Sequence, residues 1–127
     1  MQFSVKTNKR EEIIDITSRV KELVERKKGK ACLVYVPHAT CAVIVNENYD
    51  QAVCEDILHY LREQIPQGKW KHDNIDNNAD SHIKAILLGP SELIPMQNGE
   101  LQLGQWQGIG LVELDGPRER NVVIEVL

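Results

Sequence analysis

Three of the four histidines in this sequence stand where an imidazole could do chemistry. His38 lies in the stretch PHAT between two apolar runs, His72 lies in a polar loop, and His82 falls in the first turn of an expected helix. Near a helix N-terminus the dipole favours a neutral imidazole, which can act as a ligand or a base. Three such side chains have the composition of a His₃ site with one open coordination position, the arrangement of a catalytic, zinc-like metal centre.

The spacing of these histidines does not prove that they meet. It lacks the compactness of motifs such as HExxH, so their convergence depends on the fold. Each also has an ordinary explanation, because polar side chains are common in turns and His38 could form only local hydrogen bonds there. The fourth, His59, lies inside an expected helix and is treated as a partly exposed helix residue. The metal site at His38, His72 and His82 is therefore a hypothesis.

The three cysteines form no motif for disulfide formation or metal binding. Cys32, Cys41 and Cys54 are odd in number and lack CxxC spacing. In one straight strand His38 and Cys41 would point to opposite faces, and a thiol in an apolar run is usually a buried hydrophobe. We therefore do not take Cys41 as a nucleophile, and we expect a soluble protein of the reducing, cytoplasmic compartment.

Asn46 and Glu47 lie at the far end of the apolar run that follows PHAT. At about 3.3 Å per residue, a straight strand places them roughly 20 Å from His38. Glu47 can then support the histidine site only if the strand bends or a neighbouring subunit supplies it. The alternative is structural, because Asn48 and Asp50 could start the next helix while Glu47 complements its dipole. Both interpretations stay open.

Cationic side chains and helix N–H groups indicate a subsite for an anion. Arg118 and Arg120 follow the turn DGP, where guanidinium groups could bind a phosphate or carboxylate in bidentate fashion, although solvated turn charges are the ordinary explanation. Lys84 and the N–H groups that open the helix after Asn78 could hold the same anion near the metal. The glycines of this C-terminal region do not form GxGxxG between a strand and a helix, so a dinucleotide fingerprint is rejected.

An α+β fold is expected to position these side chains. Apolar and β-branched patterns predict strands, and 3.6-residue periodicity predicts about three helices. The expected strands are 2–6, 11–16, 31–36, 41–46, 91–96, 100–104, 106–115 and 120–127, and the expected helices are 19–28 after N-caps at Thr17 and Ser18, 51–65, and 79–89. The first two strands are expected to pair, and PHAT is expected to close a hairpin. The absence of regular strand–helix alternation favours mostly antiparallel strands in one compact unit.

Chain length and net charge limit the classes of function. A chain of 127 residues is long enough to bury its own core, so residues 1–127 are treated as a single domain. The 15 basic and 19 acidic side chains give a net charge of −4, which argues against nucleic acid because phosphate binding needs a basic excess. No apolar run approaches the roughly 20 residues that cross a bilayer. We expect neither nucleic acid nor a membrane as a partner.

Several motifs resemble the YjbQ-like family, also named the secondary thiamine-phosphate synthase family. They are PHATCAVIVNEN, the histidine of WKHDN, NADSHIKAILLG and LQLGQWQGIGLVELDGPRER. The match covers nearly the whole chain, and Ala39 stands where the family often has Thr or Ser. The resemblance implies a compact α+β subunit in a homotrimer and a metal site built from the motif histidines. It also implies a thiamine-phosphate synthase activity, in which an aminopyrimidine diphosphate is joined to a thiazole phosphate.

Two classes of function stay open: a metal-dependent transferase acting on a small phosphorylated substrate, and a trimeric metabolite- or metal-binding protein without turnover. Imidazoles favour a zinc-like ion over magnesium, which prefers oxygen ligands. A homotrimer would also cover the edge of the apolar C-terminal strand. The candidate residues are His38, His72 and His82 for the metal; His82, Lys84 and Glu47 for catalysis; and Thr40, Asn78, Lys84, Arg118 and Arg120 for a phosphorylated or carboxylated ligand.

Overall fold

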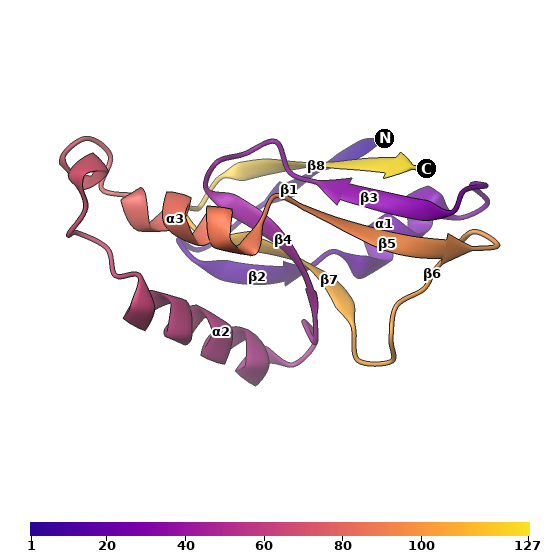
Figure 1. Ribbon diagram of the computed structural model, residues 1–127, viewed down its shortest axis with the longest axis horizontal. Helices are drawn as coiled ribbons and strands as arrows, with labels where there is room; N and C mark the ends of the chain where they lie inside the picture. The colour runs from indigo at the N-terminus through magenta and orange to yellow at the C-terminus, as the bar shows by residue number, and fades with distance from the viewer.

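Eight strands and three α-helices make up the protein in a computed structural model that describes residues 1–127 (Figure 1). The strands are β1 (Gln2–Lys6), β2 (Glu12–Asp15), β3 (Ala31–Tyr35), β4 (Cys41–Asn46), β5 (Ser91–Gln97), β6 (Glu100–Leu101), β7 (Gly108–Glu113) and β8 (Glu119–Val126). The helices are α1 (Thr17–Val24), α2 (Gln51–Gln64) and α3 (Ala79–Leu88), and a short 3₁₀ helix, η1, covers Lys71–Asn74. The predicted α+β class is confirmed.

The main core lies between two antiparallel sheets. The larger sheet has the strand order β1-β8-β3-β5-β6, and the smaller has the order β2-β7-β4. Val34 and Ile124 of the larger sheet belong to the same buried apolar cluster as Ile109 and Leu111 of the smaller one, and Val20 of α1 completes it. Burial of these aliphatic side chains is the main force that holds the sheets together.

Strand β7 is buried at every position because both of its faces are covered. Successive side chains of a strand point to opposite faces. Ile109 and Leu111 accordingly enter the inter-sheet core, whereas Val112 joins a second cluster with Leu58 of α2 and Ala85 of α3. The smaller sheet therefore lies between the larger sheet and these two helices, which Figure 1 shows along one side of the molecule.

Two of the expected strand pairings are wrong. Strand β1 pairs with β8, and β2 pairs with β7, so the first two strands do not pair with each other. Strands β3 and β4 lie in different sheets, so PHAT is no hairpin turn; residues 37–40 cross from one sheet to the other. Local periodicity indicates which residues can form a strand, but the partner is chosen by packing against segments far away in the chain.

The helices lie where they are expected, with differences at their ends. Asp50 caps α2 by accepting hydrogen bonds from the N–H groups of its first turn, as predicted. Thr17 is inside α1, and its hydroxyl binds the carboxylate of Asp15 instead of capping. This helix ends at Val24, four residues before the predicted end, and Arg26 adopts a left-handed φ of 66°. None of the helices is long and apolar enough to cross a membrane.

A buried ionic cluster fixes α3 to the segment just before β2 and to α2. The ammonium of Lys84 lies 2.9 Å from Asp80 and 3.1 Å from Glu11. Glu11 is also 3.7 Å from the guanidinium of Arg62 on α2, and Arg10 approaches Asp80 to 3.1 Å. Burial alone would raise the pKa of Asp80, but hydrogen bonds from Arg10 and Lys84 outweigh it and hold that pKa below the usual range.

We expect Lys84→Met to reduce the free energy of unfolding by about 3–5 kcal/mol at pH 7, because it leaves buried carboxylates without their ammonium partner. Urea denaturation measures the loss. Since the pKa of Asp80 is lowered, the ionised carboxylate stabilises the fold above the usual carboxyl pKa of about 4, and this stabilisation is lost as the pH falls through the lowered pKa. The difference in free energy of unfolding between Lys84→Met and wild type should therefore shrink near pH 3.

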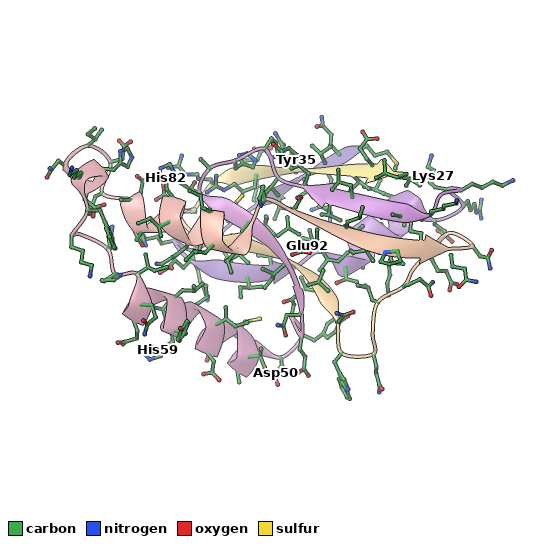
Figure 2. All side chains as sticks on the ribbon, viewed as in Figure 1. Lys27, Tyr35, Asp50, His59, His82 and Glu92 are labelled. Carbon is green, nitrogen blue, oxygen red and sulfur yellow. The ribbon has the colours of Figure 1, made fainter.

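The matched control is Lys27→Met, because Lys27 is exposed at the opposite end of the molecule from α3 (Figure 2). This change should alter the free energy of unfolding by less than about 0.5 kcal/mol. Equal stability of Lys84→Met and wild type at pH 7 would contradict the role assigned to this cluster.

Candidate functional site

His72 and His82 are brought together by η1 and α3. Their ring centroids are 5.1 Å apart, and the rings meet edge to face at 88°. The Nε2 atom of His72 is buried and has no hydrogen-bond partner, although Asp76 Oδ2 lies 3.5 Å away. A buried polar atom without a partner is uncommon and costly in a folded protein. The pair therefore presents an unused nitrogen beside a second imidazole and a carboxylate.

The loop that carries His72 is shaped by the carboxylate of Asp73. Its two oxygens accept hydrogen bonds from the N–H groups of Gly68, Trp70 and Ala79. Desolvation would raise the pKa of Asp73, but these three N–H donors outweigh it and lower the pKa. Because Ala79 begins α3, the same side chain caps that helix, whereas Asn78, which occupies the N-cap position, forms no side-chain cap bond. Asp73 thus fixes η1 relative to α3 and brings the two histidines together.

His38 reaches the same region from the crossover between the sheets. Together with His82 it lines a hollow of about 170 Å³, whose other walls include Cys41 and Ile86. Burial, and then the positive charge of Arg120, lower the pKa of His38, so its imidazole is neutral at pH 7.

The backbone N–H of Asn121 donates a 2.9 Å hydrogen bond to His38 Nε2. In the neutral ring Nε2 then carries the lone pair and Nδ1 carries the proton. His38 must release Asn121 or turn its ring before it can bind a metal ion.

His82 lies next to each of the other two histidines: it lines one hollow with His38 and another with His72. A second hollow of about 290 Å³ is lined by His72, His82, Ala79 and Ile83. No group of three or more His, Cys, Asp or Glu side chains is arranged to hold a metal ion as the side chains stand. The His₃ metal site consequently stays a prediction, and it requires a change in the orientation of His38.

Glu47 is not near these histidines within one protomer. Strand β4 stays paired with β7 from Cys41 to Asn46, so it does not bend toward His38. The neighbouring residue Asn48 is buried and donates a 2.6 Å hydrogen bond to the carbonyl of Gly108. Asn48 therefore anchors this end of β7, and the cap of α2 is Asp50 alone.

Two of the predicted anion-binding cations already have acidic partners. Lys84 is 1% exposed and held by Asp80 and Glu11. Arg120 is 4% exposed, and its guanidinium binds Glu113 and Thr40. A phosphate could bind these cations only by displacing carboxylates, which disfavours both as ligands of an anion.

Arg118 is the exposed member of the predicted anion subsite. Its guanidinium binds Asp115 through the main-chain carbonyl and, at 2.9 Å, through the carboxylate. The same carboxylate accepts a 2.7 Å hydrogen bond from the amide of Asn78, so Arg118 is tied to the start of α3, one turn before His82. The Oδ1 atom of Asn78 is buried without a partner. Arg118 and Asn78 therefore lie near the histidines, but the unpartnered atom is an acceptor that would attract a donor or a cation.

The thiols are free and buried, as expected for residues of the core. Burial raises the pKa of Cys41 to about 12, although Arg120 opposes the shift. Burial also raises the pKa of Cys32 to about 11. A thiol in these surroundings is not a nucleophile near neutral pH, because the thiolate is the reactive form.

The residues of this region that were not predicted from the sequence include Asp76, Asn121 and Glu113. Asp76 lies four residues after His72, and this spacing could have indicated it. Asn121 acts through its main chain, which no sequence motif records. Glu113 lies within an otherwise apolar run, GLVEL, where a charged side chain on a buried strand signals a buried partner.

Comparisons with known proteins agree on one family. The family described as "UPF0047 protein YjbQ-like" matches residues 1–127. A UPF0047 protein of Archaeoglobus fulgidus is 48% identical over 128 residues, covering all of both chains. The UPF0047 protein YugU of Bacillus subtilis is 38% identical, covering 98% of this chain and 96% of its own length.

Solved structures show the same fold. A hypothetical protein from Aeropyrum pernix K1 superposes with a TM-score of 0.94 at 43% identity, covering 100% of this chain and 96% of the other. A YbjQ-like protein of unknown function from Sulfolobus solfataricus P2 also gives 0.94 at 41% identity, covering 99% and 94%. The motif resemblance is thus confirmed along the entire chain, which belongs to the YjbQ-like UPF0047 family.

Proposed function

We propose that this protein binds a divalent, zinc-like metal ion through His72, His82 and a reoriented His38, and that it uses the site on a small phosphorylated substrate. The observation that carries the proposal is the buried, unpartnered Nε2 of His72 beside the ring of His82. An imidazole nitrogen held without a hydrogen-bond partner is a suitable ligand atom.

The donor set fits zinc better than magnesium. Imidazole nitrogens suit zinc-like ions, whereas magnesium requires a shell of oxygen ligands. Asp76, 3.5 Å from His72 Nε2, supplies one carboxylate beside the pair. When bound, such an ion would withdraw charge from a phosphoryl or carboxyl oxygen of the ligand. Arg118, exposed and tied to the start of α3 through Asp115, would orient that anion.

Thiamine-phosphate synthase activity is the narrower form of this proposal. It requires release of diphosphate, and this usually depends on several cationic contacts. Lys84 and Arg120 are committed to internal carboxylates, so a bound metal ion would have to supply this positive charge for turnover. The second candidate, a metabolite- or metal-binding protein without turnover, needs no such contacts. Within one protomer Glu47 has no place in either scheme, because it lies at the other end of β4.

A homotrimer is part of the proposal, on different grounds from those in the sequence. Strand β8 has neighbours on both sides, so the C-terminal strand has no edge to cover. Ile86 and Leu87 on α3 are 81% and 67% exposed, and Ile86 lines the hollow of His38 and His82. Exposed apolar side chains beside a candidate site are suited to contact with another subunit.

The buried free thiols support a reducing, cytoplasmic compartment.

We expect His72→Ala and His82→Ala each to weaken zinc binding by more than about tenfold, because each removes a ligand. Isothermal titration of tag-free protein with zinc measures this. Affinity should also fall when the pH is lowered, because protonated imidazoles do not bind metal; for His38, whose pKa is lowered, this loss should come at a lower pH than for an ordinary imidazole.

The control for zinc binding is His59→Ala, because His59 lies on the separate helix α2 (Figure 2). Its side chain is exposed beside Glu63. This variant should bind zinc as wild type does. Equal affinity in His82→Ala and His59→Ala would overturn the metal site.

Turnover distinguishes the two candidate functions. We expect zinc-loaded protein to convert an aminopyrimidine diphosphate and a thiazole phosphate to thiamine phosphate, and His82→Ala to lose this activity while His59→Ala keeps it. Chromatographic detection of thiamine phosphate measures the product. Zinc binding without product over a panel of phosphorylated pyrimidines and thiazoles would favour the binding protein.

Assembly is tested separately. We expect light scattering after size exclusion to give the mass of three subunits, because the apolar face of α3 is then covered. Ile86→Lys should shift the protein toward the monomer by placing a charge in that contact, while Lys27→Met should leave the mass unchanged. A monomer at all wild-type concentrations would refute the trimer.

A further inference from the structure

We infer that the buried ion pair of Arg120 and Glu113 positions His38, an inference that rests on the proposed function. Glu113 ends β7 in the smaller sheet, and Arg120 lies near the start of β8 in the larger one. Alternation along each strand puts both side chains on the faces that meet between the sheets. The pair therefore closes the inter-sheet core at the end where His38 lies.

The pair is bidentate, and its carboxylate is fully engaged. Arg120 Nε donates to Glu113 Oε2 at 2.8 Å, and its Nη2 donates to Oε1 at 2.5 Å. Glu113 also accepts bonds from the N–H groups of Leu114 and Asp115, both at 3.0 Å, and from the hydroxyl of Thr7 at 2.9 Å. A fork held by two parallel bonds has a defined direction, which a single point charge lacks.

The same guanidinium reaches the crossover that carries His38. Arg120 Nη2 donates to the carbonyl of Thr40 at 3.1 Å and to its hydroxyl at 2.8 Å. The next residue of β8, Asn121, donates its N–H to His38 Nε2 at 2.9 Å. Two consecutive residues of β8 thus hold two residues of PHAT, and the direction of the fork sets the position of the crossover.

Arg120 and Glu113 are positioning residues in this scheme. Neither needs to touch the metal ion, because Arg120 holds the crossover through Thr40, and this contact can persist when the ring of His38 leaves Asn121 to bind zinc. An ion pair that only held the sheets together would stabilise the fold but would influence all three histidines alike. If the pair positions His38, a substitution in it should change zinc binding only when His38 is present. If the pair only stabilises the fold, the change should be the same without His38.

Two substitutions separate Arg120's contacts. Arg120→Lys keeps the charge, but one ammonium cannot reproduce the fork to Glu113 together with the contact to Thr40. Thr40→Val removes only the hydroxyl acceptor at nearly constant volume, and Thr40→Ser restores it. Arg26→Lys, the same chemical change on an exposed loop, is the control.

Zinc titration gives the first readout. Arg120→Lys and Thr40→Val should weaken zinc binding by about tenfold, while Thr40→Ser and Arg26→Lys stay within about twofold of wild type. In a His38→Ala background, neither Arg120→Lys nor Thr40→Val should weaken zinc binding further, because the interaction acts through His38. Weakening of the same size without His38 would overturn the positioning role.

Nitrogen NMR of the histidine rings gives a readout that needs no metal. The wild-type protein without zinc should show His38 as the single tautomer with a proton on Nδ1, and both variants should show a mixture. An unchanged tautomer in both variants would overturn the inference. If wild type binds no zinc while the variants lose the tautomer, the metal function fails and the positioning of His38 stands.

Discussion

The fold depends on how it accommodates Glu113, a carboxylate buried between two sheets. An ionised side chain in such a place is strongly unfavourable unless it is paired and hydrogen-bonded. Arg120 supplies the charge, and Thr7 and two main-chain N–H groups supply the remaining donors. These donors come from the segment after β1, from the residues that follow β7 and from β8. The compensation therefore exists only when both sheets are assembled in one register, and at that point the crossover is also fixed through Thr40.

The same physical arrangement recurs on the other face of the smaller sheet. Lys84, Asp80 and Glu11 form a second buried cluster, which connects α3 to the start of β2 and, through Arg62, to α2. Apolar packing alone would let a helix slide along a sheet, because aliphatic contacts have little directional preference. Directed ion pairs oppose such sliding. As a result, the helix that carries His82 and the crossover that carries His38 are each fixed by a separate buried charge.

The sequence was most informative where structure is local. Strand and helix positions followed from periodicity, and the Asp50 cap followed from its place before an amphipathic segment. The strand partners did not follow, because β1 pairs with a strand at the far end of the chain. Lys84 and Arg120 looked like ligands for an anion, since their sequence neighbours do not reveal the partners Glu11 and Glu113. Only the fold shows that these charges are neutralised from within.

Neutralisation of these charges limits how the site could recognise an anion. Of the cations assigned to ligand binding, Arg118 alone is exposed, and Asp115 already offsets much of its charge. The orphaned atoms nearby, His72 Nε2 and Asn78 Oδ1, are suited to accept a donor or a cation. The imidazole of His38, whose pKa is lowered, adds no positive charge either. An anionic substrate would therefore need a positive charge that the side chains do not provide. A divalent ion bound to the histidines would supply that charge, and it would also give His72 Nε2 a partner.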